Sequence, residues 1–393
     1  MKCIHCSVDN KYPERVASRQ RCKGCGHPFA FEPKTDRFQI NDQLFARAIK
    51  DVSAEGTLSF TPKQLWYEVN RRILARKTFS CGAAALLLII GGSLIAQSRY
   101  AAPLVAGIPP IALCAGVVVN RSRTSGRKKK TRYVKMPFGQ FEVSYLSQWI
   151  SVHGMIPKML LPPVPHTPGS SFGGSTPPRF DLNGEPVTFG QNAAQDVTAY
   201  SFDRALIVEN SEIAAMFVAN NFHFENNCAI LSLDGYPFGT AETIKTMLAR
   251  NPLLKVFALH DATIHGTQMG LTLRRANWFP DTTIALIDLG LRPQHVIEGD
   301  MIALSDSPTH FPVGTVSSSL KGEEIAWFEQ GNTAELHALR PNRLMRAVYQ
   351  GFARANQLDG AVIGDDGFLI MPMGPSYWMY DGGADVYATD SFG

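Results

Sequence analysis

The sequence lacks the signatures of the commonest nucleotide-dependent and hydrolytic enzymes. No P-loop and no G-x-G-x-x-G segment follows any predicted strand, which argues against ATP or dinucleotide use. No G-x-S-x-G elbow follows a strand either, so a Ser-His-Asp hydrolase would have no nucleophile turn. The first residues contain no apolar segment and no small-residue cleavage site, so we expect no secretory signal and a cytosolic N-terminus.

Charged residues are absent from two long apolar runs, at 79–97 and 101–119. Each run is close to the roughly 20 residues that span the hydrocarbon core of a bilayer. We therefore expect a transmembrane hairpin over 79–120. The alternative is a buried helical hairpin of a soluble domain, which Pro109 and Pro110 disfavour because prolines weaken helices in water more than in a membrane.

Basic residues cluster on both flanks of these runs, although the formal net charge of the 393-residue chain is only +4. By the positive-inside rule, both termini are expected in the cytoplasm and the protein in the inner or plasma membrane. The run after the hairpin is expected to contact anionic lipid, with a nucleic-acid contact as the alternative. The flanking basic residues are Arg71, Arg72, Arg76 and Lys77 before the hairpin, and Arg121, Arg123, Arg127, Lys128, Lys129, Lys130, Arg132 and Lys135 after it.

The chain has only seven cysteines, and four of them form two C-x-x-C pairs near the N-terminus. Fifteen residues separate the pairs, a spacing typical of zinc sites in reducing compartments. With four thiolate ligands the site would be closed, so the predicted zinc is structural. The predicted ligands are Cys3, Cys6, Cys22 and Cys25, with His5 and His27 as further candidates. The other cysteines, Cys81, Cys114 and Cys228, lie in apolar surroundings and are interpreted as small hydrophobic residues.

These features predict a multidomain chain. The predicted parts are a zinc ribbon (1–40), a helical region (41–78), the hairpin (79–120), a basic segment with a Pro/Gly/Ser linker (121–180), an α/β domain (181–370) and a tail (371–393). The helical region is expected to contain helices at 41–53 and 61–77. In the α/β domain, short apolar runs alternate with helical stretches, which predicts a mainly parallel sheet. The expected strands are 204–210, 228–233, 254–260 and 282–289, and the expected helices are 211–220, 240–251, 266–275 and one within 340–358.

An acidic residue stands at or just beyond the end of each expected strand: Glu209, Asp234, Asp261 and Asp288. The carboxyl ends of parallel strands meet at one edge of a sheet, where ligands bind. Convergent carboxylates there would suit magnesium, which takes oxygen ligands and could activate a phosphodiester. For each residue alone, the alternative is capping of the following helix.

The order of these residues resembles the Toprim domain in its topoisomerase VI A-subunit form. Glu209 ends the first strand, Gly235-Tyr236-Pro237 follows the second, and Asp261 ends the third with Gly266 five residues later. The resemblance covers roughly 200–290. It implies that Glu209 and Asp261 hold magnesium and that the domain serves strand cleavage or transfer in nucleic acids. The family's D-x-D pair is here Asp261-Ala262-Thr263, so one carboxylate is replaced by a hydroxyl.

A second part of the resemblance lies upstream, in "FTPKQLWYEVNRR". In these topoisomerase subunits, a helix-turn-helix-like or winged-helix domain carries the nucleophilic tyrosine in a motif with paired aromatics. Tyr67 stands where that tyrosine would, with Arg71 and Arg72 as cations for the developing charge. The alternative is that Leu65, Trp66 and Val69 mark a buried helix face to which Tyr67 adds nothing chemical.

Two functions follow as hypotheses. The first is a membrane-anchored protein that performs magnesium-dependent phosphodiester chemistry on nucleic acid, as a nuclease or a topoisomerase-like strand transferase. The second is a non-catalytic scaffold, in which a degenerate Toprim fold and the zinc ribbon bind a protein partner. Thr263 favours the second, because the loss of a carboxylate weakens a divalent-ion site.

Overall fold

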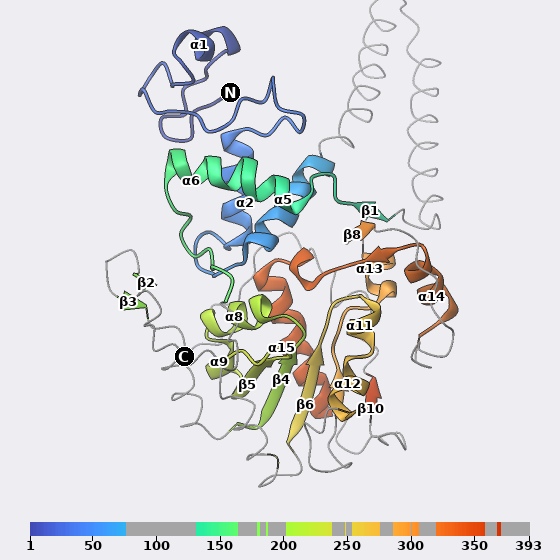
Figure 1. Cartoon of the computed structure of the whole chain (residues 1–393). Helices are drawn as coiled ribbons and strands as arrows, with labels where there is room; N and C mark the ends of the chain where they lie inside the picture. The colour runs from blue at the N-terminus through green and yellow to red at the C-terminus, as the bar shows by residue number, and fades with distance from the viewer. Residues whose placement is uncertain are drawn as a thin grey trace, which may run out of the picture.

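The computed structural model describes residues 1–75, 131–163, 179–180, 186–187, 202–237, 248, 254–275, 286–299, 301–305, 320–357 and 368–370. The predicted hairpin (79–120) and tail (371–393), and all of the predicted helix at 240–251 except Leu248, lie outside these residues. Among the residues described, no helix is both long enough and apolar enough to cross a membrane. The described chain forms a small ribbon, a helical unit and an α/β domain, stacked in that order from top to bottom in Figure 1.

The ribbon contains two loops of similar construction. In each loop the first cysteine donates its backbone N–H to a carbonyl five residues later, Cys3 to Val8 and Cys22 to His27, at 3.0 and 2.9 Å. A short helix, α1 (Tyr12–Ala17), connects the loops. The core of the ribbon is only Cys3, Cys22 and Phe29, so it is too small to hold the loops together by apolar burial alone.

The helical unit follows directly. Its elements are α2 (Asp42–Val52), a helix at 62–75, α5 (Phe138–Gln140), a π-helical turn (Phe141–Leu146) and α6 (Ser147–His153). The helix at 62–75 begins where predicted because Thr61 and Gln64 cap each other, with backbone N–H to side-chain oxygen distances of 3.0 and 3.2 Å. The packing of aromatic side chains, such as Phe45 on Trp149 with ring centroids 4.8 Å apart, fixes the unit.

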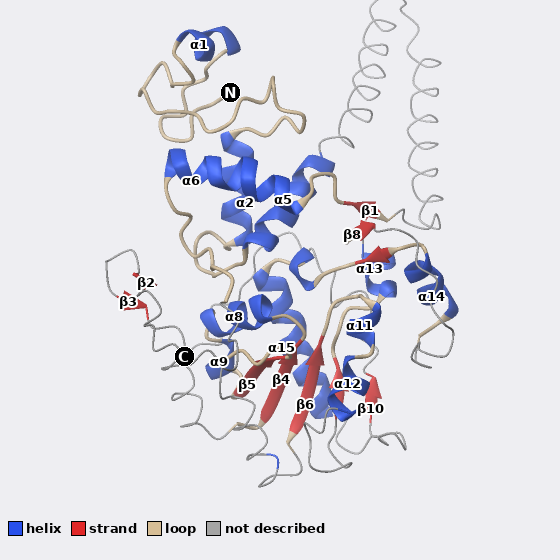
Figure 2. Cartoon of the chain, in the orientation of Figure 1, coloured by secondary structure: helices blue, strands red, loops and turns tan. Residues whose placement is uncertain are grey.

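The α/β domain is built on a five-stranded parallel sheet in the order β10-β7-β6-β4-β5. The strands are β4 (Arg204–Val208), β5 (Cys228–Ser232), β6 (Lys255–Leu259), β7 (Leu286–Asp288) and β10 (Phe368–Ile370). The first four are the strands predicted from the sequence, and their parallel arrangement is confirmed. Figure 2 shows helices on both sides of this sheet.

Both faces of the sheet are buried. Leu206 and Val208 of β4 belong to the larger core, which continues into the helical unit, whereas Ala205 and Ile207 of the same strand belong to a second core. Because successive strand residues point to opposite faces, burial on both sides requires the nearly continuous apolar runs that the sequence contains.

Helices and smaller sheets complete the domain. The helices are α8 (Ser211–Ala219), α9 (Phe222–Glu225), α11 (Ile264–Thr267), α12 (Met269–Arg275), α13 (Pro293–Gly299), α14 (Gly322–Glu329) and α15 (Pro341–Gln357), with a 3-10 turn at Leu336–Ala338. A three-stranded sheet joins β1 (Arg132–Tyr133), β8 (Ile302–Ser305) and β9 (Asn332–Thr333), and β2 (Arg179–Phe180) pairs with β3 (Pro186–Val187).

The segments before and after residues 76–130 contact each other. Trp66 donates its indole N–H to the Met136 carbonyl at 2.7 Å, and Asn70 accepts the backbone N–H groups of Lys135 and Met136 at 3.0 and 3.1 Å. Phe60 pairs with Met159 in an isolated parallel bridge. The helix at 62–75 is therefore held by the segment that follows residues 76–130.

Candidate acidic site and candidate metal centre

Glu209 and Asp261 lie side by side at the carboxyl ends of β4 and β6. The chain leaves β4 toward β5 on one side and leaves β6 toward β7 on the other, which makes this edge the switch point of the sheet. Glu209 Oε2 accepts the backbone N–H of Asp261 at 2.8 Å. Gly266 permits this approach, because a Cβ at that position would lie 2.3 Å from the Asp261 carbonyl oxygen and 2.9 Å from Glu209 Oε2.

A segment from much later in the chain closes over Asp261. Ala262 and Ala334 pair in an antiparallel bridge, and Asp261 Oδ1 accepts the backbone N–H of Leu336 at 2.6 Å. The helix-capping alternative for Asp261 is therefore wrong. Instead, Thr263 caps α11, because its hydroxyl accepts the Gly266 N–H at 2.9 Å. The Thr263 hydroxyl thus has a structural role.

Tyr67 reaches the same edge from the helix at 62–75. Its hydroxyl donates to Glu335 Oε2 at 3.4 Å, and its side chain is almost completely buried. Burial, followed by the negative charges of Glu335 and Asp261, raises the pKa of Tyr67 well above its ordinary value. The phenol is therefore a neutral hydrogen-bond donor in this arrangement. The burial agrees with the alternative of a core helix face, yet the hydroxyl points to carboxylates.

Two nitrogen-bearing side chains, Lys63 and His337, border these carboxylates. Lys63 Nζ lies 3.5 Å from Glu335 Oε1, and His337 lies between Glu212 and Glu335, with nitrogen to oxygen distances of 3.2 and 3.8 Å. We refer to Tyr67, Glu209, Asp261, Glu335 and His337 as the acidic cluster. Burial and the neighbouring Glu209 raise the pKa of Asp261 to about 7, although the His337 charge and the Leu336 N–H act in the opposite direction.

Asp288 does not belong to the acidic cluster. Its Oδ1 lies 3.0 Å from His260 Nε2 and accepts the Gly290 N–H at 2.8 Å. Burial would raise the pKa of Asp288, but the His260 charge outweighs it and lowers the pKa. Burial would likewise lower the pKa of His260, and Asp288 raises it instead. The two residues form a buried histidine–aspartate pair at the end of the sheet.

The predicted gathering of four strand-end carboxylates is not what the structure shows. Asp234 is exposed in the turn after β5, and Asp288 pairs with His260. In the part of the chain that the structure describes, two groups of three or more metal-ligating side chains have ligand atoms within 4.8 Å of one another, and neither contains a carboxylate. Arg71 and Arg72 also differ from expectation, because both pair with Glu68 instead of supporting the Tyr67 hydroxyl.

One of these two groups is the predicted set of Cys3, Cys6, Cys22 and Cys25. The sulfur to sulfur distances are 3.7 Å for Cys3 and Cys25 and 3.5 Å for Cys6 and Cys22. Four sulfurs at about 2.3 Å from a tetrahedral zinc lie roughly 3.8 Å apart. The four cysteines thus form a candidate metal centre with the right spacing.

The surroundings of Cys22 favour a thiolate. Asn10 Nδ2 and the backbone N–H of Gly24 donate to the Cys22 sulfur at 3.5 and 3.4 Å. Burial raises the pKa of this thiol, but the N–H groups outweigh burial and lower the pKa to about 6. Cys228 is buried in β5, as its apolar surroundings predicted, whereas Cys81 and Cys114 lie outside the described residues.

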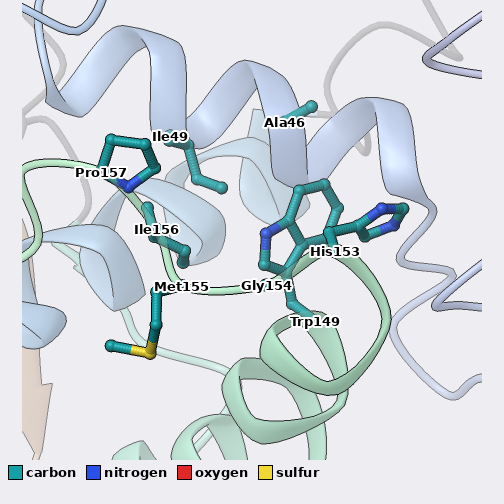
Figure 3. Close-up of a pocket in the computed structure, with 8 residues that line it drawn as sticks. All are labelled: Ala46, Ile49, Trp149, His153, Gly154, Met155, Ile156 and Pro157. Atoms are coloured by element: carbon teal, nitrogen blue, oxygen red, sulfur yellow. The ribbon is translucent and has the colours of Figure 1, made fainter. Parts of the chain in front are cut away.

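Two pockets lie near these groups. A pocket of about 420 Å³ is bordered by Lys63, Lys135, Trp66 and Glu335, next to the acidic cluster. A smaller pocket, of about 230 Å³, lies between α2 and the end of α6. Figure 3 shows Trp149 and His153 projecting from α6 at this smaller pocket, opposite Ala46 and Ile49.

No sequence pattern indicates Glu335 or His337, because neither follows an expected strand or belongs to a motif. No family model matches the chain, and no curated protein matches it. Fold and site together define a parallel α/β domain with acidic residues at its switch point, joined through a helical unit to a ribbon whose four clustered cysteines are a candidate metal site.

Proposed function

We propose that this chain is a membrane-tethered protein whose α/β domain acts as a Toprim-like unit in metal-dependent phosphodiester chemistry on nucleic acid. One observation carries the proposal. Tyr67, Glu209, Asp261 and Glu335 come from four distant parts of the sequence and lie together at one edge of the sheet. A hydroxyl nucleophile beside several carboxylates is the set of groups that this chemistry requires. The membrane tether remains the prediction made for 79–120.

In this proposal, Glu209 and Asp261 hold the divalent cation. The two carboxyl groups are close enough for Glu209 to raise the pKa of Asp261, and a cation would relieve the repulsion between them. When bound, the cation would supply charge neutralisation at the phosphodiester. We propose that this cation is magnesium, or manganese in its place.

Tyr67 is the proposed nucleophile. Its oxygen would form a bond to phosphorus while the bond from phosphorus to one sugar oxygen breaks, and its proton would pass to the Glu335 carboxylate, which already accepts the hydroxyl at 3.4 Å. Because Tyr67 is 1 % exposed, the helix at 62–75 must first separate from the 334–338 segment. The 420 Å³ pocket beside Glu335, with Lys63 and Lys135 at its border, would receive the phosphate backbone.

At the ribbon, we propose structural zinc. The four sulfurs have the donor chemistry and the spacing of a closed tetrahedral site, and the small core of the ribbon needs an additional constraint. Zinc there would hold the loops in place and would take no part in phosphodiester chemistry.

A second function is favoured by a different observation. The acidic oxygens are already engaged by the protein itself, because Asp261 Oδ1 accepts the Leu336 N–H and Glu209 Oε2 accepts the Asp261 N–H. An acidic cluster whose carboxylates already accept hydrogen bonds from the protein, and whose Tyr67 is buried, suits a non-catalytic scaffold. Such a scaffold would present the ribbon and the α/β domain to a protein partner.

Strand cleavage by the full-length chain in detergent separates the two functions. The test measures nicking of supercoiled DNA and of RNA with magnesium or manganese, and the covalent adduct between protein and nucleic acid. We expect Tyr67→Phe to abolish the adduct and Glu209→Gln or Asp261→Asn to reduce nicking at least tenfold.

Tyr145→Phe is the matched control, because Tyr145 is also buried and also donates to a carboxylate, that of Asp36, in the helical unit. It should retain wild-type activity. If the wild-type protein forms no adduct and cuts neither substrate, the scaffold function replaces the enzymatic one.

A further inference from the structure

Three histidines from separate parts of the sequence meet where the ribbon contacts the helical unit. His5 and His27 belong to the ribbon loops, and His153 is the last residue of α6. Each offers a ring nitrogen, and these three atoms lie within 4.8 Å of one another. His27 Nε2 is 3.4 Å from His153 Nδ1, and the rings of His5 and His27 have centroids 3.6 Å apart.

The spacing suits a shared metal ion. Two imidazole nitrogens at about 2.0 to 2.1 Å from a tetrahedral zinc lie roughly 3.3 to 3.4 Å apart, which matches the 3.4 Å between His27 and His153. A direct hydrogen bond between these two rings would also fit that distance. It would not account for His5, which also offers a ring nitrogen within 4.8 Å of the ligand atoms of the other two histidines.

A buried carboxylate orients His153. Asp42 is 0 % exposed, and its two oxygens accept the backbone N–H groups of Ala30 and Phe31, each at 3.0 Å. The same carboxylate lies 3.1 Å from His153 Nε2. A carboxylate there places the ring proton on Nε2, so the lone pair of the neutral ring is on Nδ1, the atom that faces His27. A carboxylate that receives the second ring N–H is the usual support of a metal-binding histidine.

We infer that His5, His27 and His153 form a second metal site, for a divalent transition metal with zinc as the first candidate. Imidazole nitrogen suits zinc, copper and nickel rather than magnesium or calcium. Three protein ligands leave one position for water or another ligand, and because His5 is exposed, that position faces solvent. The ion would link the ribbon to α6. This site is independent of the proposed phosphodiester chemistry.

Cobalt loading of the full-length protein in detergent tests the inference. Metal-free protein would be titrated with Co²⁺, with bound metal quantified by mass spectrometry and by absorption. The wild type should bind two equivalents, one with the strong thiolate charge-transfer band of the cysteine centre and one with weaker ligand-field bands alone. His5→Ala and His153→Gln should each lose only the second equivalent.

His265→Ala is the control, because His265 is an exposed histidine on α11, and it should bind two equivalents. If His153→Gln fails to fold, His5→Ala alone tests the second metal site, because the exposed His5 side chain contributes little to packing. A wild-type protein that binds one equivalent, or a His5→Ala variant that keeps both, overturns the inference. So does a thiolate band that changes in His5→Ala, because His5 would then belong to the cysteine centre.

Discussion

The Tyr67 hydroxyl lies 3.4 Å from the Glu335 carboxylate, although 268 positions separate the two residues in the chain. The contact forms because Ala262 pairs with Ala334 at the end of the sheet, while the helix at 62–75 packs over the same edge. This contact is therefore part of the packing of the helical unit onto the α/β domain.

Asp261 should make stability fall as pH rises in metal-free buffer. Its pKa is raised from 3.8 to about 7, so the folded state binds the proton more tightly than the unfolded state does. The resulting stabilisation is complete below about pH 4 and is lost as pH rises through about 7. Asp261→Asn should remove this dependence and be more stable than the wild type above pH 7, as measured by urea unfolding at several pH values. Equal pH profiles for the two proteins would contradict the prediction.

Gly290→Ala should destabilise the end of the sheet. A Cβ at this position would lie 2.1 Å from the His260 ring, which is held in place by Asp288. Such overpacking costs about 1 to 3 kcal/mol of unfolding free energy. Gly139→Ala is the control, because nothing lies within 4 Å of its added Cβ. Thermal unfolding should show a lower midpoint for the first variant only.

Glu68→Ala should weaken the interface between the helical unit and the segment that leads into α15. Glu68 is 2 % exposed and lies 2.9 Å from nitrogens of Arg340 while also pairing with Arg71. Removing the acidic partner of a buried pair costs about 3 to 5 kcal/mol. We expect roughly 1 to 3 kcal/mol here, because the arginines remain partly hydrated. Glu55→Ala, which breaks an exposed pair with Lys50, should change the free energy of unfolding by less than about 1 kcal/mol.

Asn10→Ala should loosen metal binding at the cysteine centre. Asn10 connects the two ribbon loops, because its side chain donates to the Cys22 sulfur at 3.5 Å and accepts the Lys23 N–H at 2.9 Å. Loss of such a supporting residue lowers metal affinity by about 10 to 100-fold. Zinc transfer to a coloured chelator should therefore occur at lower chelator concentration than in the wild type, whereas Asn227→Ala, in the α/β domain, should behave as the wild type.

The parts of the fold that the sequence predicted are those encoded locally. Strands such as β4 and β6 are buried on both faces, which leaves uninterrupted apolar runs. The spacing of the C-x-x-C pairs is likewise enough to predict a candidate metal site. Thr61 and Pro62 indicate where the helix at 62–75 begins.

What the sequence did not reveal depends on contacts between distant segments. His153 faces His27 because Asp42 fixes its ring, and Glu335 enters the acidic cluster because its segment pairs with residue 262. No local repeat of apolar residues in the sequence predicts either arrangement. The sequence position of Thr263 suggests a lost metal ligand, whereas in the structure its hydroxyl caps α11.

The contacts between Asn70 and residues 135 and 136 have a practical consequence. Trp66 and Asn70 of the helix at 62–75 contact residues 135 and 136, which lie shortly after the described chain resumes at residue 131, so the replacement of residues 76–130 need not break these contacts. We expect a short flexible linker in their place to yield a shortened protein that keeps the ribbon, the acidic cluster and the contact between Trp66 and Met136.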